Sequence, residues 1–395
     1  MRKIYLDHIA TTPLHPHALE AMLPFLKENF GNAQSPHSAG QEAAAAVEEA
    51  REKVARLINA HPAEIFFTSS GSESNNFALK GLSLANQSRG KNIVLSAIEH
   101  QSVLHSAKSL EKLGFSVTLV GVDKYGMVDP AEVEKAISKE TLLASVMLAN
   151  SEVGTVEPIK EIAQVCRSRD VLFHTDAVAA VGNIAVDVRE LGVDSLSLAA
   201  SQFYGPKGAA ALYIRKGTRI LPFIDGGIQE GGRRAGTENV AGIVGLGKAA
   251  EIAQGRMRSW AESLKPLRDR LIKLLPQKVE RAILTGHPEK RLPHHASFCI
   301  EFIEGEAMLM MLSSKGVAAS SGSACTSRAL KASHVLTAMG LPPEIAQGSL
   351  LFTLGVDNSE QDVDYVLEVL PPIVDRLRQM SPLYAKFIKK QRGGR

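Results

Sequence analysis

The stretch Val171-Leu172-Phe173-His174-Thr175-Asp176 is a short apolar and β-branched run that closes on a carboxylate. Similar runs occur on both sides of it, at 64–68, 92–97, 116–121, 142–149 and 195–199. Most of the segments between these runs are long enough for a crossover helix. Between residues 47 and 58, apolar residues recur at the spacing of one face of a helix. This alternation predicts an α/β domain with a mostly parallel sheet, whose loops at the strand ends hold the functional site.

The last third of the chain has a different pattern. We expect one long helix from about residue 244 to about 275, followed by mixed strands and helices. Ser359 and Asp362 form a helix-start motif, and Pro371-Pro372 is expected to kink or divide the helix that follows. We therefore expect a large α/β domain at 14–255 and a smaller α+β domain made of 1–13 and 256–395.

Composition excludes several classes of function. The chain has 395 residues, 45% of them hydrophobic and 22% charged, as expected for a globular protein. A net charge of +3 is too small to indicate binding to nucleic acid or to a membrane surface. No apolar run is long enough to cross a bilayer, and the amino terminus turns polar too early for a signal peptide. The three cysteines form no CxxC pair, so we expect a reducing, cytoplasmic compartment.

Cys325 gives the strongest chemical signal. It lies in Ser320-Ser321-Gly322-Ser323-Ala324-Cys325-Thr326-Ser327, where glycine and small hydroxyl residues favour a loop over a helix or strand. A free cysteine can also fill a turn as a small apolar side chain. The flexible neighbours favour a reactive thiol, which such a loop can carry to a substrate and then to an acceptor.

Three weaker signals come earlier in the chain. Ser69-Ser70-Gly71-Ser72-Glu73-Ser74 opens a helical segment, where backbone N–H groups suit a phosphate, although a serine N-cap is the simpler explanation. Asp176, at the end of a predicted strand, can pair with a pyridinium nitrogen or be an ordinary capping aspartate. His100 can stack on a flat ring, although a lone histidine is more often structural.

Together these residues resemble the cysteine desulfurases of the NifS/IscS type, within the class V aminotransferase group of pyridoxal-phosphate (PLP) enzymes. The resemblance covers almost the entire chain. The SSGSAC form of the Cys325 loop is similar to the IscS subgroup. Further matching segments lie at 5–13, 30–32, 68–76, 99–100, 150–154, 174–177, 204–208 and 232–239.

The resemblance implies a fold-type I PLP-transferase with a mostly parallel sheet of seven strands in its large domain. It also implies a homodimer with the cofactor site at the subunit interface. Asp176 would face the pyridine nitrogen, and His100 would stack on the ring. Gly71 and Ser72 would hold the phosphate, helped across the dimer by Thr237.

The same resemblance implies partners for Cys325. Its thiol would attack the sulfur of a cysteine-derived intermediate, leaving alanine and an enzyme persulfide. It is also a candidate ligand of an iron–sulfur cluster whose other ligands come from elsewhere. The segment Ser381-Pro382-Leu383-Tyr384 would lie near the docking surface for an iron–sulfur scaffold or sulfur-acceptor protein. His294-His295 and Cys299 lack the regular spacing of metal ligands.

The sequence departs from the family where the cofactor is anchored. The family's Schiff-base lysine stands two residues before the tyrosine of YGPKG, and Gln202 occupies that position here. An amide can neither form an imine nor shuttle a proton as an amine does. We therefore predict that PLP is not bound covalently and that ordinary PLP turnover is lost. Lys207 is a weak candidate for a substitute, because the family carries a lysine there beside the catalytic one.

Five further changes fall in the same site. Leu351 stands where the family has an arginine that clamps the substrate carboxylate, so that carboxylate would be left unpaired. The other four changes are Ala199 for a serine, Ser201 for a histidine, Ala179 for a glutamine and Ser151 for an asparagine.

The leading hypothesis is a catalytically degenerate cysteine desulfurase homologue in sulfur transfer or iron–sulfur cluster assembly. In it, Cys325 receives a persulfide or ligates a cluster. One alternative is an active enzyme with non-covalently held PLP or with a substrate that lacks a carboxylate. Another is a non-catalytic regulatory or interaction protein in which Cys325 is a relic.

Overall fold

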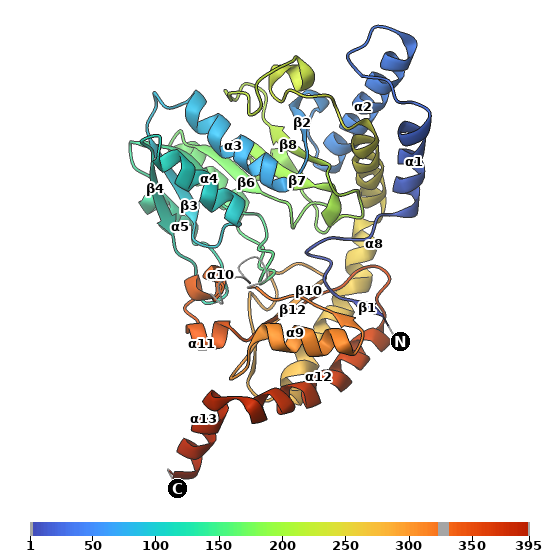
Figure 1. Ribbon diagram of the computed structural model, residues 1–395. Helices are drawn as coiled ribbons and strands as arrows, with labels where there is room; N and C mark the ends of the chain where they lie inside the picture. Colours follow the sequence, from blue (N-terminus) through green and yellow to red (C-terminus); the bar gives the residue numbers. More distant parts are fainter. Residues whose placement is uncertain (1–2, 323–331, 394–395) are drawn as a thin grey trace.

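A seven-stranded sheet forms the centre of the larger, upper part of the molecule (Figure 1). The computed structural model describes residues 3–322 and 332–393 of the chain. The strand order of the sheet is β2-β8-β7-β6-β5-β3-β4, and only β8 runs antiparallel to its neighbours. The strands are β2 (Ile65–Thr68), β3 (Asn92–Ser96), β4 (Ser116–Val120), β5 (Thr141–Ser145), β6 (Leu172–Asp176), β7 (Ser195–Ala199) and β8 (Ala210–Ile214).

This sheet confirms the predicted α/β class and its mostly parallel topology. Each of the six apolar runs predicted from the sequence overlaps a strand of the sheet. β8 was not predicted from the sequence. It begins with Ala210 and Ala211, and alanine has little preference for strands. Its place between β2 and β7, where all five of its residues are buried, stabilises it.

Helices cover both faces of the sheet. α3 (Gly71–Ala85) and α4 (Gln101–Glu111) pack on one face, around Phe66, Ile93 and Leu95. The other face is covered by helices that share a second apolar cluster with the strands. They are α2 (Ser38–Leu57), α5 (Pro130–Ala136), α6 (Ile159–Ser168), α7 (Val188–Leu191) and the first part of α8 (Val240–Lys278). α1 (Pro16–Lys27) lies beside α8 (Figure 1).

A smaller α+β unit lies at the other end of α8 (Figure 1). Its antiparallel sheet has the order β12-β10-β9, and β1 pairs with β11 in a second, two-stranded sheet. These strands are β1 (Ile4–Tyr5), β9 (Ala282–Leu284), β10 (His295–Ile300), β11 (Val317–Ala318) and β12 (Ser349–Thr353). The helices are α9 (Gly305–Ser314), α10 (His334–Ala338), α11 (Pro343–Ala346), α12 (Glu360–Met380) and α13 (Pro382–Gly393).

α8 connects the two units. Ile243 and Leu246 in its first turns belong to the core of the large sheet, whereas Leu264 and Leu271 belong to the core of the small unit. We propose that the division between the two domains falls within this helix, near residue 255. None of the helices in the described ranges is both long and apolar enough to span a membrane.

α12 begins as predicted, with a capping box between Ser359 and Asp362. Pro371 and Pro372 do not divide it, because the helix continues to Met380. Two adjacent prolines remove two helical N–H donors and strain the preceding turn. Burial of Leu370, Ile373 and other apolar residues of α12 in the core of the small unit offsets that cost.

Candidate functional site

A cavity of about 430 Å³ opens at the carboxyl ends of the parallel strands. The large sheet contributes the loops after β3, β5, β6 and β7, and the small unit contributes parts of 320–322, 333–335 and β12. The structure thus brings most of the predicted site residues together. Those that line the cavity are Gly71, Ser72, His100, Ser151, Asp176, Ala179, Ala199, Ser201, Gln202 and Leu351.

Two predicted residues are not part of this lining. Thr237 is exposed on the segment after the 3₁₀ turn η3 (Gln229–Gly232), and it does not line the cavity of its own chain. Cys325 lies outside the described residues. The flanking positions Gly322 and Ser333 are described, and both line the cavity.

Asp176 ends β6, the middle strand of the large sheet, and it is buried. Its Oδ2 accepts a hydrogen bond from Asn75 Nδ2 at 2.6 Å, and its Oδ1 accepts one from the Val178 backbone N–H at 3.0 Å. Burial raises the pKa of the Asp176 carboxyl, while nearby His100 and these hydrogen bonds oppose the rise. The carboxylate is therefore fixed in direction and sits at the floor of the cavity.

His100 is the N-cap of α4, and this role orients its ring. Its Nδ1 accepts a hydrogen bond from the Ser102 backbone N–H at 3.1 Å and lies 2.7 Å from Ser102 Oγ. Because Nδ1 is an acceptor there, the neutral ring carries its proton on Nε2. Asn75 also donates to Ser102 Oγ, at 2.8 Å, so the contacts of Asp176 and His100 are linked.

The first turn of α3 forms another wall of the cavity. Ser70 is its N-cap and accepts a hydrogen bond from the Glu73 backbone N–H at 3.1 Å. The first N–H groups of a helix have no partner within the helix and suit an anion. A Cβ atom on Gly71 would lie 2.5 Å from Val178 Cγ2, so only glycine allows α3 to approach the loop after Asp176 this closely. Gly71 and Ser72, the residues predicted to hold a phosphate, lie in this first turn.

Gln202 lies in the 3₁₀ turn η2 (Ala200–Gln202) that follows β7, and it is only 8% exposed. Its Nε2 donates a hydrogen bond to the Ile9 carbonyl oxygen at 3.0 Å. Its Oε1 has no hydrogen-bond partner among the described residues. Thr12 fixes the turn, because its N–H and hydroxyl both donate to the Ser201 carbonyl, at 2.8 and 2.9 Å. Lys207 is exposed and does not line the cavity.

Leu351 is held by the antiparallel sheet of the small unit. Its backbone N–H donates to the Ser320 carbonyl at 2.8 Å and its carbonyl accepts from Ser320 N–H at 3.2 Å. The side chain is buried and contributes apolar surface to the cavity wall.

The cavity contains acidic groups that the sequence analysis missed. Besides Asp176, it is lined by Glu99 and Glu152, whereas no lysine or arginine of the described ranges lines it. Burial raises the pKa of Glu99 to about 8 and that of Glu152 to about 7. Both could have been suspected from the sequence, because Glu99 is next to His100 and Glu152 is next to Ser151 in segments that match the family.

Glu99 is fully buried, and its two oxygens differ in their contacts. Oε1 accepts hydrogen bonds from Ser96 Oγ at 2.6 Å and from the Met147 backbone N–H at 2.8 Å. Oε2 is buried without a hydrogen-bond partner among the described residues. Glu152 accepts a hydrogen bond from Ser333 Oγ.

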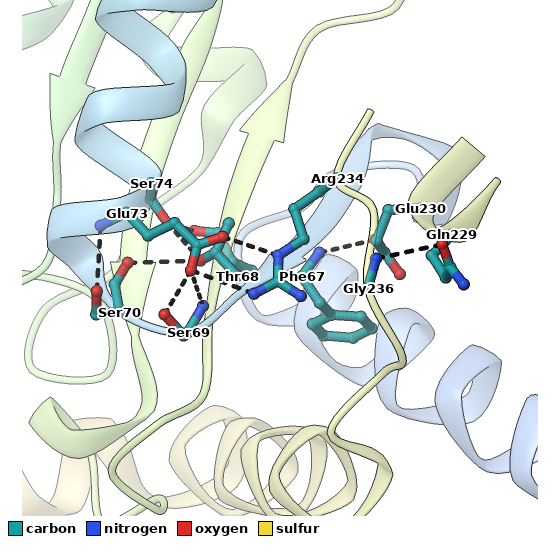
Figure 2. Close-up of polar contacts among 11 residues, drawn as sticks. Phe67, Thr68, Ser69, Ser70, Glu73, Ser74, Gln229, Glu230, Arg234 and Gly236 are labelled. Atoms are coloured by element: carbon teal, nitrogen blue, oxygen red, sulfur yellow. Dashed lines mark hydrogen bonds and ion pairs between the residues drawn. The ribbon is translucent and has the colours of Figure 1, made fainter. Parts of the chain in front are cut away.

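The segment that carries Thr237 is tied to α3 by a partly buried ion pair and to β2 by a hydrogen bond (Figure 2), and to α2 by a buried ion pair. Glu73 Oε1 binds Arg234 Nε at 2.8 Å, and Glu73 Oε2 accepts from the Ser69 backbone N–H at 2.8 Å. Glu230 binds Arg51 through two contacts of 2.8 Å and also accepts from the Phe67 backbone N–H at 2.8 Å. These contacts hold the exposed Thr237 at a defined place on the surface.

Metal ligands are sparse in the part of the chain that the structure describes. Residues 3–322 and 332–393 contain no group of three or more His, Cys, Asp or Glu side chains that could hold a metal ion. Cys166 and Cys299 are buried, and burial raises the pKa of each thiol to about 12. Neither is therefore a good nucleophile or ligand. The predicted cluster ligand, Cys325, lies outside these ranges.

The comparisons with known proteins agree with this geometry. The family model of class V aminotransferases matches residues 4–366. The cysteine desulfurase IscS of Dictyoglomus turgidum is 51% identical over 381 residues, which cover 96% of this chain and 97% of the relative. The cysteine desulfurase IscS of Methanosarcina thermophila is 51% identical over 385 residues, which cover 98% of this chain and 95% of the relative.

Solved structures show the same similarity. A NifS-like protein superimposes with a TM-score of 0.89 at 38% identity, covering 95% of this chain and all of that one (100%). A NifS-like protein from Rickettsia africae superimposes with a TM-score of 0.86 at 29% identity, again covering 95% of this chain and 100% of the other. The fold-type I architecture expected from the sequence is thus confirmed.

Proposed function

Since the chain belongs to the IscS/NifS-like cysteine desulfurases of the class V aminotransferase family, we propose that it serves sulfur transfer without performing PLP-dependent desulfuration itself. Gln202 is the observation that carries this proposal. By its spacing from Tyr204 it would occupy the position of the family's imine-forming lysine, which supports the proposal together with its place in the cavity lining and the hydrogen bond from its amide nitrogen to the Ile9 carbonyl. An amide nitrogen is not nucleophilic enough to condense with an aldehyde.

PLP is the cofactor expected for this family, and the cavity fits it in part. Asp176 would hold the pyridine nitrogen, His100 would cover a face of the ring, and Ser72 with the first turn of α3 would hold the phosphate. When bound, PLP supplies an electron-withdrawing ring. The covalent anchor does not fit, because the amide of Gln202 replaces the amine. These contacts support non-covalent binding.

Leu351 supports the loss of amino-acid chemistry. An arginine clamps a carboxylate with two parallel hydrogen bonds, and the leucine side chain that faces the cavity can make none. An unpaired buried charge costs about 1–3 kcal/mol or more. Free cysteine would therefore bind weakly in this cavity, even with PLP present.

We assign sulfur transfer to Cys325. A thiolate there can attack the outer sulfur of a donor's persulfide, so that a new S–S bond forms on Cys325 and the donor leaves as a thiolate. The two other cysteines are buried and poorly ionised, which supports this assignment. A cluster-ligand role for Cys325 with a partner scaffold belongs to the same proposal, as does a reducing, cytoplasmic compartment.

The resemblance to IscS-type desulfurases implies a dimer that delivers sulfur to an acceptor protein. We propose the same assembly here, with Thr237 reaching the phosphate site of the partner subunit. Its exposed position on an anchored segment supports this role. The acceptor or scaffold protein would dock near α13.

One experiment tests the proposed function directly. The purified protein is mixed with PLP, its absorption is followed in the aldimine region, and the sample is reduced with borohydride and digested. We expect no lysine adduct and no alanine when L-cysteine is supplied. A pyridoxyl-lysine peptide, or steady alanine formation, would contradict the proposal. Cys325→Ser should abolish persulfide uptake from a donor persulfide without changing the absorption.

A second function is favoured by the preserved contacts of the ring site. Asp176, Asn75 and His100 remain linked by short hydrogen bonds, as a working cofactor site requires. These contacts suit an enzyme that holds PLP non-covalently and acts on an amine without a carboxylate. Product formation from an amine such as cysteamine, but not from cysteine, would distinguish it.

A further inference from the structure

The ionisable side chains that line the cavity are mostly carboxyl groups. Glu99, Glu152 and Asp176 line it, and the described part of the chain adds no lysine or arginine to oppose them. Glu99 Oε2 is buried without a hydrogen-bond partner among the described residues. Such a lining favours a ligand group that is cationic and donates hydrogen bonds.

Gln202 adds an acceptor whose direction is fixed. Its Nε2 donates to the Ile9 carbonyl oxygen at 3.0 Å. The reverse orientation of the amide would bring Oε1 against that carbonyl, and two acceptors repel each other. The anchored nitrogen therefore leaves Oε1 as the polar atom of Gln202 that is free to meet a ligand.

We propose that this cavity binds the amine form of the cofactor, pyridoxamine 5′-phosphate, in preference to the aldehyde form, with the ammonium group of the ligand donating to Gln202 Oε1. The inference rests on the proposed function, because both depend on the absence of an imine-forming lysine. The amine form carries its own nitrogen and needs no lysine. It is also a donor with positive charge, whereas the aldehyde oxygen is only an acceptor and would meet the acceptor of Gln202.

The two forms share every other contact. The ring nitrogen, ring face and phosphate are identical, so Asp176, His100 and the first turn of α3 would hold either form. The difference in their affinities therefore reports on the end of the cavity at Gln202. Burial raises the pKa of Glu99 to about 8 and that of Glu152 to about 7, and a cationic ligand group beside these carboxyls would favour their ionised forms.

The test is a pair of equilibrium titrations of the full chain, one with pyridoxamine 5′-phosphate and one with PLP. A hydrogen bond to a charged group changes affinity by about tenfold or more, so we expect the amine form to bind at least about tenfold more tightly. Equal affinities, or tighter non-covalent binding of PLP, would overturn the inference. A pyridoxyl-lysine adduct after borohydride reduction would instead overturn the proposed function.

Variants of Gln202 sharpen the test. Gln202→Met keeps the length of the side chain but removes the acceptor, so the preference for the amine form should fall to near unity. Gln202→Lys should reverse it, giving a coloured adduct with PLP that borohydride fixes on the new lysine. An unchanged preference in Gln202→Met would overturn the inference. If that variant does not bind inorganic phosphate as the native chain does, Gln202→Glu is used instead and should strengthen the preference.

Gln101 provides a matched control. It is the first residue of α4 and also lines the cavity, but its Nε2 lies 3.2 Å from His334 Nδ1. Gln101→Met removes the same chemical group from a different wall. In this variant we expect the ratio of the affinities for pyridoxamine 5′-phosphate and PLP to stay as in the native chain. If Gln101→Met lost the preference for the amine form as Gln202→Met does, the specific role of Gln202 would be overturned.

Discussion

Burial raises the pKa of two neighbouring carboxyl groups of the cavity, Asp176 and Glu99, and their hydrogen bonds oppose this rise in different ways. Asp176 uses both of its oxygens, one towards Asn75 and one towards the Val178 backbone N–H, and has His100 nearby. Glu99 has hydrogen bonds to Oε1 alone, and the negative charge of Asp176 adds to the burial that raises its pKa. Glu99 is thus an acid of the cavity whose ionisation costs the fold stability.

This difference predicts how stability depends on pH. The pKa of Glu99 is about 8 in the folded chain, against an ordinary value of 4.5 for a glutamate side chain. Between these values the folded chain binds more protons than the unfolded chain, so the free energy of unfolding falls as the pH rises. Glu99→Gln, which cannot ionise, should flatten this fall by about 1.4 kcal/mol for each pKa unit removed.

Urea unfolding at about pH 6 and about pH 9 measures the effect. Relative to the native chain, Glu99→Gln should gain stability at the higher pH. Glu132→Gln is the control, because Glu132 is exposed on α5 beside Lys135 and should leave the pH dependence unchanged. The same pH dependence in Glu99→Gln and in the native chain would show that Glu99 does not become buried as a neutral acid.

At the scale of elements, the approach of α3 to the loop after β6 depends on one glycine. A Cβ on residue 71 would meet Val178 Cγ2 at 2.5 Å, and valine has little rotamer freedom to move away. Gly71→Ala should therefore cost about 1–3 kcal/mol and weaken phosphate binding, because the first turn of α3 must shift.

Gly255 is the matched control for this prediction. It lies inside α8, and a Cβ there would have nothing within 4 Å. Gly255→Ala should therefore stabilise the chain by about 0.5–1 kcal/mol through helix propensity. Urea unfolding and a titration with inorganic phosphate separate the two variants. If Gly71→Ala changed neither the free energy of unfolding nor phosphate binding, α3 would tolerate displacement.

The segment carrying Thr237 depends on a buried ion pair between α2 and η3. The Arg51 and Glu230 side chains are 10% and 3% exposed, and their two contacts are 2.8 Å long. Glu230→Gln removes the buried charge partner of Arg51 and leaves only the exposed Glu48 as its ion-pair partner, so it should cost about 3 kcal/mol. Removing the exposed pair of Arg258 by Glu262→Gln should change stability by less than about 1 kcal/mol. Thermal unfolding compares the two, and equal small losses would contradict the anchoring role.

The elements also show how far sequence reasoning reaches. Apolar runs closing on polar residues predicted six strands and placed Asp176 at a strand end, because burial on both faces requires such runs. β8 was missed, since its stability comes from its neighbours. Glu99 and Glu152 were missed for a related reason. An acid beside a strand end is usually solvated, and only the packing of α4, β5 and 333–335 reveals their burial.

At the scale of the whole molecule, the cavity is assembled from segments more than 300 residues apart. Ile9 holds Gln202, and the β12 residue Leu351 closes the wall opposite the large sheet. The Thr353 carbonyl accepts from the His8 backbone N–H, so the amino-terminal segment is fastened to β12 as well. Changes at Gln202 and Leu351 therefore alter the same cavity from the two units of the molecule.

The surface that carries Thr237 leads to the last prediction, which concerns the assembly. Phe30 is 86% exposed and Ile228 is 77% exposed, and the segments that carry them are joined by a hydrogen bond of 2.9 Å from Gln34 to Glu238. Large exposed apolar side chains grouped in this way indicate an interface.

We expect Phe30→Ser combined with Ile228→Ser to convert the proposed dimer into monomers in analytical ultracentrifugation. Cofactor affinity should fall with it, because Thr237 then no longer reaches the partner's phosphate site. Met310→Ser, which removes an equally exposed side chain from the small unit (76%), should leave the mass unchanged. A double variant that remains dimeric would place the interface elsewhere.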